Sequence, residues 1–171
     1  MKTIYLAGGC FWGTQKFFDQ FDGVTGTEVG YANGPDEAPS YPDVCLGSGH
    51  VETVRIEYDE ARISLTQLLD LYFLTIDPLA VNHQGDDYGR QYRTGIYYTD
   101  DAQLDEIRAV WAREEEKAGA PLAVELLPID NFFPAEDYHQ KYLDKNPAGY
   151  CHIPQSLLHM AEDGKPGGMK G

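Results

Sequence analysis

The alternation of apolar and polar positions along the chain predicts short strands separated by helices. Apolar residues that recur at every second position indicate strands, and apolar residues at intervals of three and four indicate helices. The expected strands cover residues 3–7, 24–31, 51–58, 92–98 and 124–129. The expected helices cover residues 10–23, 64–77, 100–119 and 134–145.

The order of these elements predicts the fold class. It runs β-α-β-β-α-β and then α-β-α, which begins as the split βαβ arrangement of ferredoxin-like proteins. We therefore expect an α+β fold, a ferredoxin-like two-layer sandwich in which helices pack on a mixed β-sheet. The chain has 171 residues with no internal repeat or linker, so residues 1–171 form a single catalytic domain in this interpretation. Residues 146–171 have little periodicity and are expected to form an irregular tail that carries Cys151.

Charge and composition restrict the classes of partner. Lys and Arg number 13 against 28 Asp and Glu, a formal charge of −15, which repels nucleic acid and anionic membranes. No apolar run approaches the roughly 18 residues that span a bilayer. Three cysteines are too few for a secreted disulfide scaffold, so we expect a reducing compartment, an uncleaved N-terminus and a cytoplasmic location.

Cys10 is the first candidate for chemistry, because it lies where the first strand ends and the first helix begins. Backbone N–H groups and the helix dipole at that position stabilise a thiolate. Gly9 and Gly13 allow a substrate to approach the backbone, and Phe11 and Trp12 are suited to lining an apolar pocket. The competing interpretation is a small buried hydrophobic residue, which is the usual fate of a free cysteine.

The residues around Cys10 also carry a family resemblance. Gly9-Cys10-Phe11-Trp12-Gly13 resembles the signature of the A-type peptide methionine sulfoxide reductases. Similar blocks follow in the family's order: Gly30-Tyr31-Ala32, Tyr41-Pro42-Asp43-Val44-Cys45, Gly49-His50-Val51-Glu52, Gln84-Gly85-Asp86-Asp87, Gln91-Tyr92-Arg93 and Asn146-Pro147-Ala148-Gly149-Tyr150-Cys151. Together they span residues 9–151, nearly the whole chain.

The resemblance implies a nucleophile, an acid and two phenols. Cys10 as thiolate would attack the sulfur of methionine sulfoxide, free or in proteins, release methionine and become a sulfenic acid. Glu52 matches the family's acid, and Tyr41 and Tyr92 match the phenols that hold the oxygen. Glu52 must then be protonated near neutral pH, which burial against apolar rings would achieve. Without the resemblance, Glu52 reads as an exposed carboxylate on the third strand.

Three further positions match the family. Asp87 resembles an acidic residue that orients the site and the catalytic thiol, and its competing interpretation is an ordinary loop aspartate. Phe11 and Trp12 resemble the pair that receives the methyl group of the substrate. The S epimer is implied as substrate by the family alone.

The resemblance implies a redox cycle of two cysteines. Cys151 lies in the expected tail, where a mobile thiol can reach a sulfenic acid and close a disulfide, so it matches the resolving residue. Cys45 also matches a family position but is taken as structural. Many relatives have a further recycling cysteine in a glycine-rich tail, which residues 164–171 lack. Thioredoxin or another dithiol is therefore the implied reductant, with no prosthetic cofactor, no metal and a monomeric protein expected.

Two departures from the family and two alternative functions stay open at this point. Gln15 stands where Glu is frequent in the family and Asp86 where Asn is frequent. The electrostatics of the helix start and of the loop beside Asp87 therefore differ from those of the family.

A cysteine hydrolase or acyltransferase would also place a thiolate at a helix start, with one of the 5 histidines as base. An acidic binding module with an inert Cys10 is the other alternative. Counting thiols after exposure to a sulfoxide separates these classes.

Overall fold

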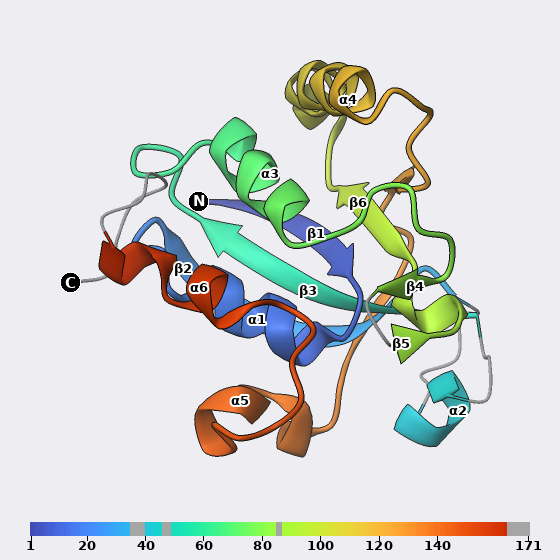
Figure 1. Cartoon of the computed structure of the whole chain (residues 1–171), viewed down its shortest axis with the longest axis vertical. Coiled ribbons are helices and arrows are strands. Elements are labelled where there is room, and N and C mark those ends of the chain that lie inside the picture. The colour runs from blue at the N-terminus through green and yellow to red at the C-terminus, as the bar shows by residue number, and fades with distance from the viewer. Residues whose placement is uncertain (35–39, 46–48, 85–86, 164–171) are drawn as a thin grey trace.

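A curled six-stranded sheet forms the centre of the computed structural model, which describes residues 1–34, 40–45, 49–84 and 87–163 (Figure 1). Across the sheet the strands are β7 (Glu125–Pro128), β6 (Thr94–Tyr98), β1 (Lys2–Gly8), β3 (Val51–Tyr58), β2 (Val24–Ala32) and β8 (Phe132–Pro134). β6 and β7 pair in parallel, and the other pairs are antiparallel. β4 (His83–Gln84) and β5 (Asp87–Tyr88) form a separate antiparallel pair. The fold is thus α+β with a mixed sheet, as the order of elements predicts.

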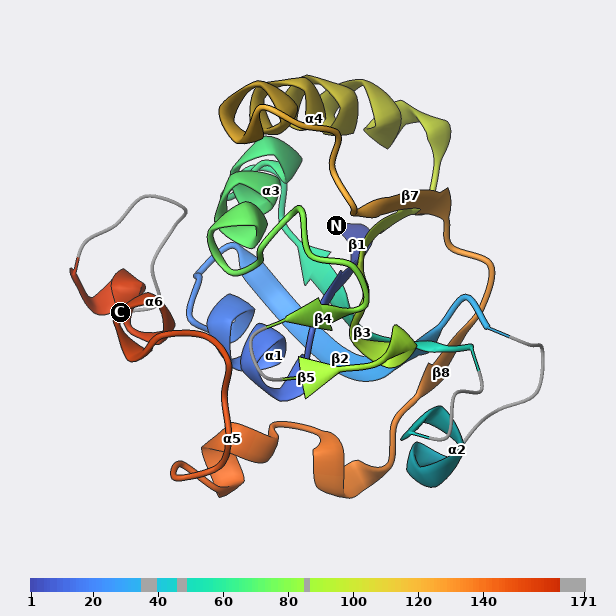
Figure 2. The same ribbon diagram turned by 45° about the vertical axis from the view of Figure 1, so that its right-hand side comes forward.

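The helices gather on the sheet and around one of its ends. α1 and α3 lie on the same face, with α4 packed outside α3 (Figures 1 and 2). The α-helices are α1 (Phe11–Asp19), α2 (Tyr41–Cys45), α3 (Leu65–Leu74), α4 (Leu104–Ala118), α5 (Tyr142–Lys145) and α6 (Gln155–Leu158). The 3-10 helices are η1 (Arg90–Tyr92), η2 (Asp101–Gln103), η3 (Asp137–His139) and η4 (Met160–Asp163). Among the described helices none is long and apolar enough to cross a membrane.

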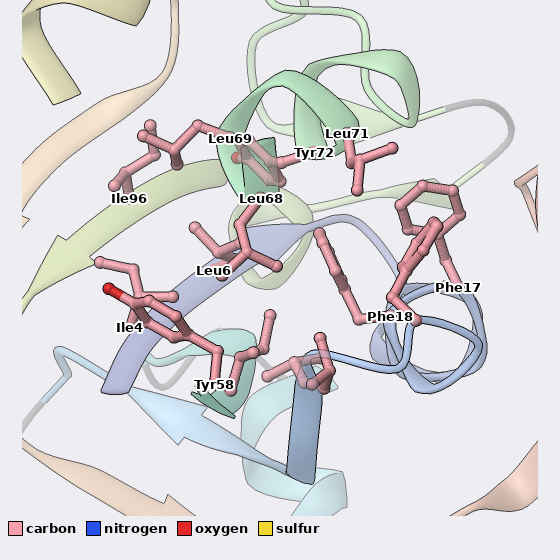
Figure 3. Packing of buried hydrophobic residues seen from close by; sticks show 14 of the residues in the cluster. Ile4, Leu6, Phe17, Phe18, Tyr58, Leu68, Leu69, Leu71, Tyr72 and Ile96 are labelled. Carbon is pink, nitrogen blue, oxygen red and sulfur yellow. The ribbon is translucent and has the colours of Figure 1, made fainter. Parts of the chain in front are cut away.

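The main core lies between the sheet and the layer of α1 and α3 (Figure 3). Ile4 and Leu6 of β1 face this layer and are fully buried, as is Phe18 of α1. Each such side chain stabilises the fold by about 1.5–3 kcal/mol through burial. The Tyr72 hydroxyl of α3 donates a hydrogen bond of 2.6 Å to the carbonyl of Ala7. The end of β1, where Cys10 follows, is therefore anchored to the core.

Local sequence signals mark the helix ends where they were expected. The Ser64 side chain accepts from the Gln67 N–H while the Gln67 side chain accepts from the Ser64 N–H, the reciprocal capping box that their spacing predicts. α4 ends at Gly119, which has a left-handed φ of 68°.

The predicted helix over residues 134–145 is wrong. Pro134 pairs with Gly30 as part of β8, and only η3 and the single turn of α5 are helical. Lys141 has a left-handed φ of 55°, and its N–H donates to the Gln15 side chain of α1 at 2.8 Å. The Gln140 side chain bonds both the N–H and the carbonyl of Val29, as a paired strand would. Pairing with β2 and α1 therefore overrides the helical pattern.

Three smaller expectations also change. The segment between the expected strands over residues 24–31 and 51–58, for which the sequence predicts no helix, contains α2, which starts at Tyr41. Tyr92 ends η1 and lies outside the strand to which the sequence assigns it, because β6 begins at Thr94. The tail carries the short helical segments α6 and η4 within its described part, and residues 164–171 lie outside the described residues.

Candidate active site

Cys10 lies at the N-cap of α1, directly after the turn that ends β1. Gly9 makes this turn with a left-handed φ of 87°, and a Cβ there would lie 2.8 Å from Cβ of Gln84. Only glycine fits both the conformation and the space. The Cys10 side chain is 6% exposed, so the thiol is buried but can be approached.

Glu52 lies next to the start of α1. It occupies the second position of β3, on the same face of the strand as the buried residues Val54 and Ile56, and is 1% exposed. Its Oε1 accepts the Phe11 N–H at 3.2 Å, and Oε2 is buried with no hydrogen-bond partner among the described residues. Burial raises the pKa of Glu52 to about 8; the Phe11 N–H opposes this shift and the charge of Asp87 adds to it. The carboxyl group is therefore neutral at pH 7 and has one oxygen available.

The resting thiol of Cys10 is also protonated, in contrast to the thiolate that its position predicts. Burial raises its pKa well above the usual range, and the charge of Glu52 adds to this shift. The N–H of Trp12 lowers the pKa, but it is the weaker influence. Loss of water and neighbouring carboxylates outweigh the helix N-terminus here.

Tyr92 connects the remaining polar groups of the site. Burial raises its pKa, followed by the charges of Glu52, Tyr41, Cys10 and Asp87 in that order. These groups come from β3, α2, the start of α1 and β5, so the fold brings together five residues that lie far apart in the sequence. The two phenols, the buried carboxyl group of Glu52 and the Cys10 thiol are therefore close enough to interact electrostatically.

The two aromatic residues after Cys10 have different surroundings. Phe11 is 1% exposed, and its ring lies 5.3 Å from that of His139, measured between centroids. Trp12 is only partly buried, stacks on Tyr142 at 3.8 Å, and donates its indole N–H to Nδ1 of His139 at 3.0 Å. Trp12 is thus the more accessible of the two rings, and His139 contacts both.

Sequence reasoning missed two residues that hold this region. His139 accepts from Trp12, and Glu136 accepts from the Tyr31 hydroxyl at 2.8 Å and from the Tyr41 N–H at 3.0 Å. Burial would raise the pKa of Glu136, but these hydrogen bonds outweigh it and lower the pKa. Because residues 134–145 are expected to form a helix, no sequence-based expectation placed Glu136 and His139 at the site. The signal that could have indicated them is an acid and a histidine on either side of Tyr138.

Cys151 lies against the first turn of α1. Its Sγ is 2.7 Å from the position that a Cβ on Gly13 would occupy, so the missing side chain of Gly13 makes room for the sulfur. Sγ accepts the Ile153 N–H at 3.4 Å. Burial raises the pKa of this half-buried thiol, and both Cys10 and Cys151 are free.

The remaining positions singled out from the sequence contribute less. Gln15 is buried and bonds Thr27 and Lys141, so it links α1 to the segment before α5. His50 packs its ring on Phe133. Asp86 and the side chain of Cys45 lie outside the described residues. The described part of the chain contains no group of three or more His, Cys, Asp or Glu residues that could hold a metal ion.

A comparison with known protein families identifies the family of the chain. A family model described as peptide methionine sulfoxide reductase matches residues 2–164. The chain belongs to this family. Among similar proteins, a peptide methionine sulfoxide reductase MsrA of Clostridium acetobutylicum is 55% identical over 92% of this chain and 98% of its own. One from Lachnoclostridium phytofermentans is 51% identical over 95% and 98%, respectively.

Solved structures of the family have the same fold. Reduced Mxr1 of Saccharomyces cerevisiae is 38% identical, with a TM-score of 0.83 over 90% of this chain and 91% of its own. Methionine sulfoxide reductase A of Corynebacterium diphtheriae is 34% identical, with a TM-score of 0.80 over 90% and 82%. Mxr1 in complex with Trx2 is 28% identical, with a TM-score of 0.57 over 82% and 84%.

The relatives establish the class of enzyme. This reductase is a peptide-methionine (S)-S-oxide reductase, an oxidoreductase that reduces methionine sulfoxide with thiols. They give no support to the alternative of a cysteine hydrolase or acyltransferase.

Proposed function

We propose that Cys10 attacks the sulfur of methionine S-sulfoxide, free or in proteins, and that Glu52 is the acid that passes a proton to the sulfoxide oxygen. The observation that carries this assignment is the buried Glu52 carboxyl, which lies at the start of α1 with one oxygen unpartnered among the described residues. Trp12, together with Phe11, forms an apolar wall for the methyl group. Tyr41 and Tyr92 donate to the sulfoxide oxygen.

The chemical step moves one proton from sulfur to oxygen. Cys10 Sγ first bonds to the substrate sulfur. This transient S–S bond and the S–O bond of the substrate then break as the oxygen passes to Sγ, so the thiol and the sulfoxide become a sulfenic acid and methionine. Attack needs a thiolate, and the departing oxygen needs a proton. Cys10 and Glu52 are both protonated at rest, so the reacting form has one proton fewer, shared between them. Glu52 passes this proton toward the oxygen.

Asp87 is a positioning residue in this proposal. Its charge acts on both Cys10 and Glu52, since it raises the pKa of each. It therefore helps to retain the proton in the site until substrate arrives. The family resemblance implies an orienting role, and the effect of the Asp87 charge on both protons is consistent with a residue that acts through Cys10 and Glu52.

Cys151 resolves the sulfenic acid as a disulfide, and thioredoxin then reduces that disulfide. The position of Sγ on the first turn of α1 supports the first part, because it is close to the residue that becomes oxidised. The solved complex of Mxr1 with Trx2 supports the second. The cycle uses protein thiols and needs neither a prosthetic group nor a metal.

The cellular and architectural proposals follow from this cycle. Free thiols and a thioredoxin reductant fit a cytoplasmic monomer. The strand order β6-β1-β3-β2 supports the ferredoxin-like two-layer description of the domain, with β7 and β8 added at the edges. Residues 146–171 act as the segment that delivers the resolving thiol.

Separated epimers of methionine sulfoxide test the proposal. Without a reductant, the wild-type protein should convert one S sulfoxide per chain and lose two thiols, at Cys10 and Cys151. Cys151→Ser should also convert one sulfoxide but stall as a sulfenic acid, so turnover with thioredoxin stops. Mass spectrometry of product and protein measures both. Normal thioredoxin turnover in Cys151→Ser would remove the resolving role.

A further inference from the structure

His152 is a titratable residue that the proposed cycle leaves without a role, and its ring lies along the first turn of α1. Its Nε2 lies 3.2 Å from the position that a Cβ on Gly9 would take, and its Nδ1 lies 3.5 Å from the equivalent position on Gly13. Cys10 lies between these two glycines in the chain. The imidazole therefore lies against the backbone from the Gly9 turn to the first turn of α1, the segment that carries Cys10, and it belongs to the residue directly after Cys151.

The Nδ1 edge of this ring and the sulfur of Cys151 meet the same point of α1. The Cβ position of Gly13 lies 2.7 Å from Sγ of Cys151 and 3.5 Å from Nδ1 of His152. Both ring nitrogens are buried, and neither makes a hydrogen bond of regular geometry to a described residue. The distances of 2.7 Å and 3.5 Å add to 6.2 Å, so Nδ1 lies at most that far from Sγ, and the thiol, which donates to the Ile153 carbonyl at 3.6 Å, must turn from that carbonyl toward Nδ1 to pass on its proton.

The protonation state of the ring suits a base. Burial lowers the pKa of His152, and the nearby Gly8 carbonyl only partly opposes this shift. A neutral imidazole has one N–H and one nitrogen that accepts a proton. With Nε2 directed at the Gly8–Gly9 turn, the tautomer that donates there leaves Nδ1 as the acceptor.

The resolving step requires such a base. The thiol of Cys151 is protonated at rest because burial raises its pKa, and only a thiolate attacks a sulfenic acid efficiently. We propose that Nδ1 of His152 accepts the thiol proton of Cys151 as its sulfur attacks the sulfenic acid of Cys10. This inference rests on the proposed roles of the two cysteines.

The atoms balance in this step. A bond forms between the sulfurs of Cys10 and Cys151, and the S–O bond of the sulfenic acid breaks. Glu52 gave up its proton in the first step and, with a pKa of about 8, regains one from solvent at pH 7. The departing hydroxide takes this proton and leaves as water. The proton on His152 then returns to Glu52 through solvent. The sulfenic sulfur is reduced and the thiol sulfur is oxidised, so no further reductant is needed.

Another histidine provides a matched control. His159 is exposed and lines the same surface groove as Cys151, together with Lys16, Asp144 and Gln155. It is the competing candidate for the base. The variants His152→Gln and His159→Gln make the same chemical change at two places. The first removes the ring beside α1, and the second removes the ring in the groove.

The two half-reactions should be timed separately in the absence of thioredoxin. We expect His152→Gln to form methionine within about twofold of the wild-type rate, because Cys10 and Glu52 are intact. Disulfide formation, followed by loss of the Cys151 thiol in quenched samples, should slow by about 10²-fold, at the low end for a positioned base. The sulfenic acid should then accumulate and be trapped by dimedone. His159→Gln should match the wild type in both steps.

Chemical rescue separates a base from a structural filler. Imidazole added to His152→Ala should restore disulfide formation, whereas pyrazole, a ring of the same size and far lower basicity, should not. Equal rescue by both rings would overturn the proposal, as would a wild-type rate of disulfide formation in His152→Gln or a slow step in His159→Gln. An intramolecular disulfide formed in Cys151→Ser would instead overturn the assignment of the resolving cysteine.

Discussion

The two proposed redox cysteines, Cys10 and Cys151, are held by different kinds of structure. Cys10 follows a strand that pairs on both sides, with β3 and β6, and it begins a helix packed in the core. Cys151 follows the single turn of α5, and a contact with Ile153 and packing on Gly13 hold its sulfur. A substitution near Cys10 should thus affect both half-reactions, and one that disturbs only the packing of Cys151 should affect disulfide formation alone.

The two cysteines can also be compared by the protonation of their thiols and by the groups that can take the thiol protons. Burial raises the pKa of both thiols, so neither is a thiolate at rest. Each sulfur therefore depends on a neighbouring group that can take its proton. Glu52 at Cys10 is held by β3, whereas the group nearest Cys151 in sequence, His152, belongs to the same irregular segment as the thiol.

Cys10→Ser should have the largest effect, the complete loss of methionine formation. A hydroxyl is a far weaker nucleophile than a thiolate, and Cys10 is the residue at the N-cap of α1. The fold should survive, since serine has nearly the same size. Product measurement with the S epimer tests this, and the thermal unfolding midpoint is the control. Any retained turnover would show that the regular part of the fold does not supply the nucleophile.

Glu52→Gln should slow methionine formation by roughly 10² to 10⁴, the contribution of a positioned acid. The amide keeps the shape of the side chain but cannot transfer a proton. Substrate binding should change much less. Single-turnover rates measure the effect, and a variant within a few-fold of the wild type would reduce Glu52 to a structural carboxyl group.

The pH profile of the same variant gives a second test. The pKa of Glu52 is raised to about 8, so Glu52 and Cys10 are both protonated below that pH. Since the reacting form has one proton fewer, the apparent second-order rate should rise with pH and level off near pH 8. In Glu52→Gln the rate should continue to rise toward the higher pKa of Cys10. An unchanged profile would separate Glu52 from the proton transfer.

Gly13→Ala should affect the Cys151 side alone. The new methyl group would lie 2.7 Å from Sγ of Cys151, so the sulfur must move by a fraction of an ångström. We expect disulfide formation to slow by about tenfold, since small misplacements of reacting atoms are costly. Methionine formation should remain near the wild-type rate. Equal slowing of both steps would mean that the two regions are not independent.

His139→Phe should have the smallest effect, a few-fold rise in KM with little change in kcat. Phenylalanine retains the ring packing but removes the acceptor of the Trp12 indole N–H, leaving the apolar wall less firmly held. In a Trp111→Phe background, the fluorescence of Trp12 reports the change directly. An unaltered emission spectrum together with an unaltered KM would show that stacking on Tyr142 holds Trp12 by itself.

Short-range signals in the sequence determined most of the elements and the position of the proposed nucleophile. Alternating apolar residues set β1 and β3, the pair Ser64 and Gln67 set the start of α3, and Gly119 set the end of α4. The order of glycine, cysteine and aromatic residues around Cys10 placed it at a helix start. These features depend on neighbours in the chain, so they can be interpreted without knowledge of the fold.

Only the tertiary structure decided the segment over residues 134–145 and the protonation of the site. The apolar spacing of that segment fits a helix, but hydrogen bonds with β2 and α1 are formed by residues more than 100 positions away and outweigh local propensity. The helix start at Cys10 favours a thiolate, but burial and the charge of Glu52 reverse that preference. Both depend on groups that folding brings together from distant parts of the chain, and propensity describes only near neighbours.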